Sequence, residues 1–555
     1  MASFSITGQV VDPIGQRMYP AEVRVEDGRI GALQELTGER AQTVKNGPYL
    51  VPGFVDSHVH IESSMLIPVQ FARLAVVHGT VATVSDPHEI ANVCGVPGVQ
   101  FMMDNARQSP FKFNFGAPSC VPATSLETAG AVLDADAVEE LLKQPEIRYL
   151  SEMMNFPGVL QEDPVVLQKI AAARRLNKPV DGHAPGLRGE AARRYVEAGI
   201  STDHECFARE EALEKIGYGM KILIREGSAA KNFDALIDLL NDYPDQMMFC
   251  SDDKHPDSLV DGHINQLCAR ARRAGIPVFH ILRAACVNPV MHYKLEVGLL
   301  RVGDPADLVV LKDLETFEVL QTYLDGNLVA ENGLSRIEVP APSPQPINHF
   351  GCGKKQVSDF EIRERPDAPG QEMAVIEALD GQLITRKSWE KPCIRRGCLV
   401  SDPGRDLLKI AVVNRYRDAP VAVSFIRNFG LKSGAIASSV AHDSHNLVVV
   451  GVEDRDICRA VNLLISHQGG ICYVHPDLES VLPLPVAGLM SQQDGYQVAD
   501  AYAQLDRLVK DHGCSLTAPF MTLSFMALLV IPHLKLSDLG LFDGDRFELI
   551  PAVRS

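Results

Sequence analysis

The sequence lacks the features that mark several large classes of protein. Acidic residues outnumber basic ones, 71 to 53, and the formal net charge is −18, so the basic surface typical of nucleic-acid-binding proteins is missing. The twelve cysteines include no Cys-x-x-Cys pair, which disfavours a disulfide scaffold and a zinc ribbon. These absences favour an intracellular enzyme that acts on a small molecule.

Long hydrophobic runs and targeting segments are also missing. The longest apolar run near the end of the chain, residues 520–531, is too short to span a membrane and is closed by Pro532. Residues 1–4 show neither the charged region nor the apolar region of a signal peptide. We therefore expect a cytoplasmic protein with no membrane partner.

Among the features that are present, a closely spaced pair of histidines comes first. Residues 49–55 form an apolar stretch that predicts a buried strand, and Asp56-Ser57-His58-Val59-His60 continues it. Two imidazoles two residues apart at the end of a strand point the same way and can hold one metal ion. Taken alone, the pair is equally typical of two surface or core histidines.

Other side chains that can bind a metal recur farther along the chain, each at the end of a short β-type run. They are Glu152, His183, His204 and Asp252. Helical patterns such as residues 164–175 and 190–198 lie between them. The repeated order of strand, ligand and helix is typical of a parallel βα barrel, whose chemistry is located at the C-terminal ends of the strands.

Counting strands supports an α/β fold built on a closed (βα)8 TIM-like barrel. The candidates are residues 50–57, 80–86, 111–117, 147–152, 178–183, 199–204, 218–225 and 246–252. Residues 49 to 289 span about 240 residues, close to the roughly 250 expected of such a barrel.

Further domains are expected on both sides of the barrel. Residues 4–12 and 21–30 alternate around an Asp-Gly turn, and residues 308–311 and 322–329 predict strands after the barrel. From these patterns alone, the two regions would be separate strand pairs. A proline-rich stretch predicts a linker at 339–350, and alternating strands with one helix predict an α+β domain over residues 351–555.

Several ordered motifs resemble the adenine deaminases of the amidohydrolase superfamily, and the resemblance runs over nearly the whole chain. They are residues 52–65, Asp86-Pro87-His88-Glu89-Ile90-Ala91-Asn92, Asp181-Gly182-His183-Ala184-Pro185-Gly186, Asp203-His204-Glu205-Cys206, Arg225-Glu226-Gly227-Ser228, Ser251-Asp252-Asp253 and Ala441-His442-Asp443-Ser444-His445-Asn446. The resemblance implies a metal-dependent hydrolase barrel over residues 51–296. It also implies that residues 1–50 and 297–338 join in one small β-sandwich beside the barrel.

The chemistry of such an enzyme requires an activated water molecule. Replacing the exocyclic amine of a purine by oxygen needs hydroxide at neutral pH, which divalent metal ions can supply. The ligands divide between two ions, with His58, His60 and Asp252 around one, His183 and His204 around the other, and Glu152 as the bridge. Many amidohydrolases use a carboxylated lysine as this bridge. The alternative for Glu152 is a carboxylate that caps a helix or pairs with an arginine.

Asp252, Glu152 and His204 are the candidate catalytic residues. Asp252 lies beside the nucleophile and can pass the proton of the water to the departing amino group. For its neighbour Asp253 we favour a position at a helix N-terminus over a place at the metals. The resemblance makes Mn²⁺ the favoured metal, and Fe²⁺ and Zn²⁺ suit the same ligands.

Loops beside the metals are expected to contact the purine base. His88, Glu89 and Arg225 are the candidates, and each could instead be a salt-bridged loop residue. Glu226 and Ser228 follow in the same loop as Arg225. The downstream motif of residues 442–446 either reaches the barrel mouth and closes it over the substrate, or forms only a turn.

Three functions follow from this pattern. The first, which the resemblance favours, is hydrolytic deamination of adenine to hypoxanthine and ammonia. The second is hydrolysis of a cyclic amide by the same metal centre, because barrel and ligands do not determine the leaving group. The third is a non-catalytic barrel that only binds, against which the intact ligand set argues. A chain of this size with extra domains is compatible with a homodimer.

Overall fold

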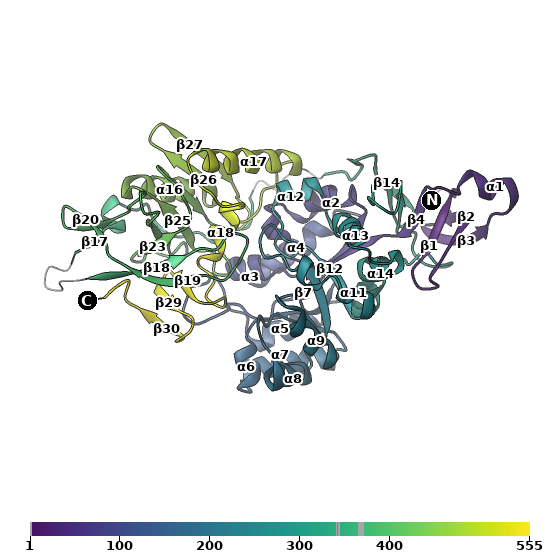
Figure 1. Ribbon diagram of the computed structural model, residues 1–555, viewed down its shortest axis with the longest axis horizontal. Coiled ribbons are helices and arrows are strands. Elements are labelled where there is room, and N and C mark those ends of the chain that lie inside the picture. The colour runs from purple at the N-terminus through teal and green to yellow at the C-terminus, as the bar shows by residue number, and fades with distance from the viewer. Residues whose placement is uncertain (1–2, 340, 342–344, 365–370, 555) are drawn as a thin grey trace.

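The computed structural model describes residues 3–339, 341, 345–364 and 371–554. The chain forms three parts in a row along its longest axis (Figure 1). A sheet that contains the N-terminal strands lies at one end, a βα barrel in the middle, and the C-terminal region at the other end. Residues 340 and 342–344 of the predicted linker lie outside the described residues.

The first part is one eight-stranded sheet built from both sides of the barrel sequence. Its order is β16-β15-β14-β13-β4-β1-β2-β3. Its strands are β1 (Phe4–Asp12), β2 (Arg17–Glu26), β3 (Arg29–Glu35), β4 (Tyr49–Pro52), β13 (Leu308–Leu311), β14 (Val319–Leu324), β15 (Asn327–Glu331) and β16 (Leu334–Ser335). Val10, Val23 and Ile30 share one core with Leu308 and Val310, so distant segments cover each other's apolar faces.

The apolar run at residues 49–57 is two strands and not the single strand that its pattern predicts. Tyr49–Pro52 is β4 of the sheet, and Phe54–Val59 is β5, the first barrel strand. The chain changes sheet at Gly53, where a Cβ atom would lie 2.3 Å from a methyl carbon of Val81. Only glycine permits this close approach of backbone to side chain.

The expected α/β barrel is confirmed. Its eight strands are β5, β6 (Thr80–Ser85), β7 (Lys112–Ala117), β8 (Ile147–Met153), β9 (Val180–Gly182), β10 (Thr202–Asp203), β11 (Lys221–Arg225) and β12 (Met247–Cys250). Strands β5 to β9 pair with one another in parallel, in that order, and so do strands β10 to β12. The Ser201 amide donates to Val180 O (2.9 Å), and the His60 amide donates to Asp252 O (3.2 Å). These bonds join β9 to the start of β10 and the end of β12 to β5, which closes the barrel.

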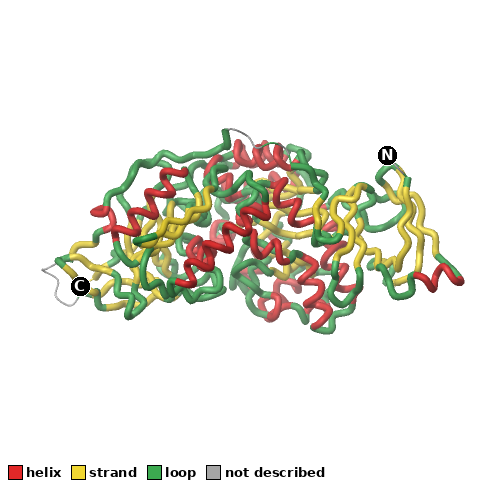
Figure 2. Tube along the Cα trace, turned by 90° about the horizontal axis from the view of Figure 1, so that it is seen from above, coloured by secondary structure: helices red, strands yellow, loops and turns green. Residues whose placement is uncertain are grey.

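Helices surround the barrel strands, as Figure 2 shows in red around yellow. They are α2 (Pro68–Val76), α3 (His88–Cys94), α4 (Val96–Ala106), α5 (Ala135–Leu142), α6 (Phe156–Leu160), α7 (Pro164–Arg175), α8 (Gly189–Glu197), α9 (Arg209–Gly217), α10 (Phe233–Leu236), α11 (Leu239–Asp242), α12 (Pro256–Asp261), α13 (Ile264–Arg273), α14 (Val278–Leu282) and α15 (Asn288–Tyr293). In α13, Ile264, Leu267 and Ala271 are buried at helical spacing, so one stripe faces the barrel.

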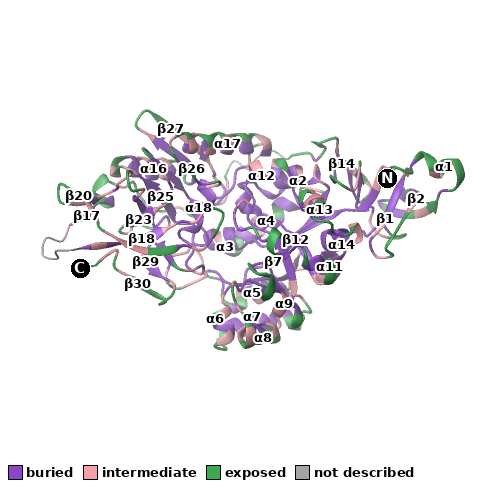
Figure 3. Cartoon of the chain, viewed as in Figure 1, coloured by how far each residue is buried: buried purple, intermediate pink, exposed green. Residues whose placement is uncertain are grey.

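The C-terminal part is sheet-rich, and its described residues form three α-helices. Its main sheet has the order β19-β18-β23-β22-β25-β24-β26-β27, with β31 (Val553–Arg554) beside β18. The strands are β18 (Glu372–Glu377), β19 (Arg386–Glu390), β22 (Leu408–Val413), β23 (Ala422–Arg427), β24 (Ala435–Ser438), β25 (Leu447–Gly451), β26 (Gly470–His475) and β27 (Leu478–Pro483), and the helices are α16 (Asp454–His467), α17 (Gly495–Asp511) and α18 (Pro519–Phe525). The strands under α16 are buried (Figure 3).

The C-terminal part packs directly on the barrel. His255 Nδ1 lies 2.6 Å from Tyr502 Oη on α17, and the Ser491 amide donates to Met65 O (2.8 Å). Asp538, which follows β28 (Leu534–Ser537), accepts from the Thr128 amide (2.9 Å) in the loop after β7. No helix within the described ranges combines the length and apolar character that crossing a membrane requires.

Candidate metal centre and the cavity above it

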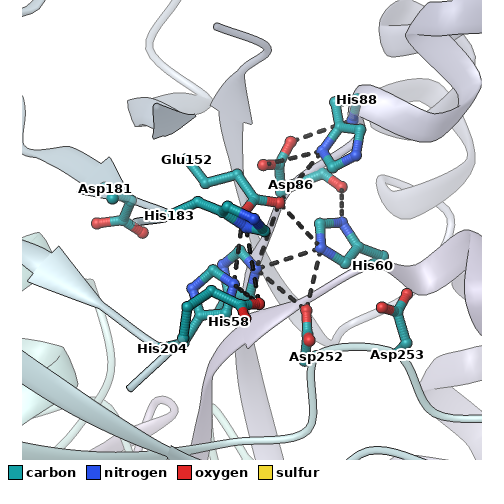
Figure 4. A network of polar contacts seen from close by, with 12 residues as sticks. His58, His60, Asp86, His88, Glu152, Asp181, His183, His204, Asp252 and Asp253 are labelled. Carbon is teal, nitrogen blue, oxygen red and sulfur yellow. Dashed lines mark hydrogen bonds and ion pairs between the residues drawn. The ribbon is translucent and has the colours of Figure 1, made fainter. Parts of the chain in front are cut away.

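The six side chains predicted as metal ligands meet at one point inside the barrel mouth (Figure 4). Each comes from the C-terminal end of a strand, where parallel strands of a barrel present their side chains to a shared space. All six are buried. They are His58 from β5, His60 after β5, Glu152 from β8, His183 after β9, His204 after β10 and Asp252 after β12.

Glu152 lies between two groups of imidazoles. Its Oε1 atom is 3.3 Å from His60 Nε2. Its Oε2 atom is 2.6 Å from His183 Nδ1 and 3.3 Å from His204 Nε2. One carboxylate therefore presents a different oxygen to each group, which is the arrangement a bridging ligand needs.

Asp252 completes the first group. Its Oδ1 atom lies 3.4 Å from His58 Nε2 and 3.2 Å from His60 Nε2. The His58 and His204 rings stack at 4.1 Å, and potential ligand atoms of His58, His204 and Asp252 lie within 4.8 Å of one another. The structure therefore places His204 next to both groups, whereas the sequence pattern assigned it to one.

The donor chemistry of this cluster fits divalent cations. His60 Nδ1 lies 3.2 Å from the carbonyl oxygen of Asp86, which can only accept, so Nδ1 carries the proton and Nε2 presents a lone pair. That lone pair faces the carboxylates of Glu152 and Asp252, which are also acceptors. Acceptors converging in a buried space need protons or a metal ion between them, and imidazoles with carboxylates suit zinc, iron and manganese.

Electrostatics keep the carboxylates of the cluster charged. Burial alone would raise the pKa of Asp252. The Arg225 guanidinium, which lies 2.9 Å from Oδ2, and the imidazoles of His58 and His60 hold this pKa well below its usual range. Burial likewise opposes the ionisation of Glu152, and its contacts with His183 and other imidazoles keep the pKa low. Both side chains are therefore anions ready to ligate a metal.

Arg225 supports Asp252 and does not line the cavity. Its guanidinium is 1% exposed and is shared between Asp252 and Glu205. It was a candidate for contact with the purine, whereas this geometry makes it a partner of the candidate ligand Asp252. Glu226 pairs with Arg270, and Ser228 Oγ contacts Ser258, so neither reaches the cluster.

Asp253 corrects one expectation. The next helix, α12, begins at Pro256 with His255 as its N-cap, so Asp253 is not at a helix N-terminus. Its carboxylate accepts from Ser63 Oγ and lines the cavity beside Asp252. Burial and the neighbouring Asp252 charge raise the pKa of Asp253.

A small cavity of ≈20 Å³ lies over the cluster. Its wall comes partly from the barrel, including His88 and Glu89, and partly from the C-terminal domain. His88 Nδ1 is 3.6 Å from Glu152 Oε1, so this residue lies at the edge of the metal cluster. The C-terminal residues in the wall are Leu383, His442, Asp443, Phe525 and Leu528.

The motif of residues 442–446 reaches the barrel mouth. The two oxygens of Glu89 contact His442 Nδ1 and His445 Nε2. The Ala441 amide donates to His445 Nδ1 (3.1 Å), so His445 Nε2 carries the proton that it donates to Glu89. Both oxygens of Glu89 are thus occupied, and His442 Nε2 is buried in the cavity wall without a hydrogen-bond partner among the described residues.

Sequence reasoning missed several residues of this site. Glu205 contacts Arg225 and lies 3.5 Å from His204 Nε2. Strand alternation would point it away from the metals, but β10 ends at Asp203, so the next two side chains can both face the centre. Phe525, Leu383 and Leu528 are ordinary apolar residues with no local signal of function.

Two family models match the chain. Residues 49–329 match the amidohydrolase family, and residues 382–548 match the adenine deaminase C-terminal domain.

Relatives match over nearly the whole length. An adenine deaminase of Sulfurovum sp. is 56% identical over 98% of both chains. Those of Salinibacter ruber and Borreliella burgdorferi are 53% and 46% identical over 99% of both. Among solved structures, an enamidase is 17% identical with a TM-score of 0.45, and covers 62% of this chain and 99% of its own.

Proposed function

Because this chain belongs to the adenine deaminase family of the amidohydrolases, we propose that it hydrolyses adenine to hypoxanthine and ammonia. The observation that carries the proposal is the meeting of four imidazoles and the Asp252 carboxylate around Glu152, directly below a small cavity. A flat heterocycle in that cavity would present its exocyclic amine to the cluster.

A pair of divalent metal ions, when bound, would supply Lewis-acid activation of water at neutral pH. We propose His58, His60 and Asp252 as ligands of one ion, and His183 and His204 as ligands of the other, with Glu152 shared. Mn²⁺ is our proposal for the metal, and Fe²⁺ or Zn²⁺ would suit the same nitrogen and oxygen donors.

The side chains of the cavity divide the proton transfers. Asp252 is held as an anion by Arg225 on Oδ2, which leaves Oδ1 to accept the proton of the attacking water and return it to the leaving amino group. His442 Nε2 has no hydrogen-bond partner among the described residues and lies 3.8 Å from Asp253 Oδ1, and it is placed to hydrogen bond with a ring nitrogen. Glu89 orients His442, and His445 orients Glu89.

The test is ammonia release from adenine, with hypoxanthine identified as product, beside a panel of cyclic amides. We expect turnover of adenine alone. Turnover of a cyclic amide without adenine would assign the chain to the second reaction class, and bound metal with no turnover of any ring substrate would indicate a binding protein. We further propose that the enzyme works in the cytoplasm as a homodimer, in purine salvage and adenine catabolism.

A further inference from the structure

A fully buried lysine joins two segments of the cavity wall. Lys535 lies on β28 and is 0% exposed. Its Nζ atom donates to Leu383 O (2.6 Å) and to Phe525 O (2.8 Å), and forms no ion pair with any described residue. Burial alone lowers its pKa to about 7. Burying an ammonium group without a carboxylate partner costs free energy, so the two carbonyl groups that accept from Lys535 are a clue to its role.

Both acceptors belong to residues that cover the cavity. Leu383, Phe525 and Leu528 are its three C-terminal apolar residues, which we call the roof. The Phe525 ring also stacks on His442 at 4.5 Å with an interplanar angle of 18°. The position of the Phe525 backbone therefore affects both the apolar cover and the imidazole in the wall.

The backbone explains why a hydrogen-bond donor is useful at this point. Phe525 is the last residue of α18, and its carbonyl oxygen, which also accepts from the Leu528 amide (3.3 Å), lies at the negative end of the helix dipole. β28 is attached to the same two segments, because Thr385 Oγ1 donates to Leu534 O (2.8 Å) and the Leu536 amide donates to Met526 O (3.1 Å). The Lys535 side chain therefore bonds at once to the segment that carries Leu383 and to the segment that carries Phe525.

Lys409 in the same domain shows what a purely structural lysine looks like. It is also 0% exposed, and it donates to Phe360 O (3.0 Å). Unlike Lys535, it pairs with a carboxylate, that of Asp454 at 2.7 Å, and none of its partners lines the cavity. Substitutions of the two lysines can therefore separate a general effect on folding from an effect on the roof.

We propose that Lys535 is a positioning residue that sets the height of the roof over the purine ring and thereby the affinity of the enzyme for the base. The inference rests on the proposed function, since it assumes that the ring occupies this cavity. Roof contacts are made equally with bound substrate and with the transition state, so loosening them raises KM and leaves kcat unchanged.

The experiment compares Lys535→Met and Lys409→Met in the full-length, metal-loaded protein, below the unfolding temperature of each. We expect Lys535→Met to raise KM for adenine by about tenfold, the lower end of what a misfitted apolar pocket costs, with kcat little changed. Lys409→Met is expected to be less stable with KM unchanged. Phe525→Leu should raise KM as well, and combining it with Lys535→Met should add little, because both act on one roof.

Lys535→Gln covers the case in which the methionine variant does not fold. Its neutral amide carries two N–H donors on a shorter side chain and can keep part of the bonding to the carbonyls, so we expect a smaller rise in KM. A folded variant at position 535 with the KM of wild type would overturn the inference, as would an equal rise in Lys409→Met. Failure of the proposed function looks different, because wild type itself would then release no ammonia from adenine.

Discussion

The floor and the roof of the cavity are built in opposite ways. The floor consists of charged and imidazole side chains from the strand ends of one barrel, with Glu152 at its centre. The roof, Leu383, Phe525 and Leu528, is apolar and comes from the separate C-terminal domain. The comparison suggests that the barrel supplies the reaction and that the second domain supplies the fit to the substrate.

The largest expected effect concerns the floor. Removing divalent metal with a chelator should abolish ammonia release, because uncharged water is a poor nucleophile at neutral pH. Adding Mn²⁺ should restore it, and metal content measured alongside activity gives the stoichiometry. Activity that survives thorough metal removal would contradict the role of the floor as a metal site.

The next effect isolates a single group of the floor. Asp252→Asn should lower kcat by about 10³-fold, within the range that general acid–base groups contribute, because an amide cannot take the proton of the attacking water. Substrate binding should be affected far less. The matched control is Asp253→Asn, whose carboxylate lines the same cavity but lies outside the proposed ligand set. Equal losses in both variants would contradict the role given to Asp252.

A smaller effect tests the link between the domains. His442→Gln should lower kcat/KM by about tenfold, the size of one lost hydrogen bond to a ring nitrogen. His475→Gln serves as control, since His475 lies in the same domain on β26 and contacts His512 instead of the cavity. If His442→Gln retains the kcat/KM of wild type, the C-terminal domain covers the cavity but provides no hydrogen bond from His442 to the substrate.

The smallest effect concerns the stability of the roof. The pKa of Lys535 is about 7 in the folded chain and about 10.4 when unfolded. Between these values the unfolded chain binds one more proton, so this group makes stability rise with pH from about 7 to about 10. Urea unfolding at both ends of this window should therefore show that the free energy of unfolding of wild type rises with pH relative to that of Lys535→Met. A constant difference would mean that Lys535 stays charged.

Sequence reasoning was most successful where the chemistry is local. His58 lies near the end of β5 and His60 directly after it, and helix α7 spans residues 164–175 as its pattern predicts. It failed where neighbours in space decide. The run at residues 49–57 divides at Gly53 because Val81 leaves no room for a side chain. Arg225 turned out to hold Asp252 because two carboxylates, Glu205 and Asp252, lie within its reach.

The order of strands, candidate ligands and helices by itself determined the barrel and the group of candidate metal ligands, because parallel strands must bring their C-terminal ends together. Only the tertiary structure decided what covers them. Leu383, Phe525 and Lys535 carry no local signal, since an apolar side chain or a lone lysine acquires its role from the surface it is packed against. That contact forms between domains whose separate patterns do not encode how they dock.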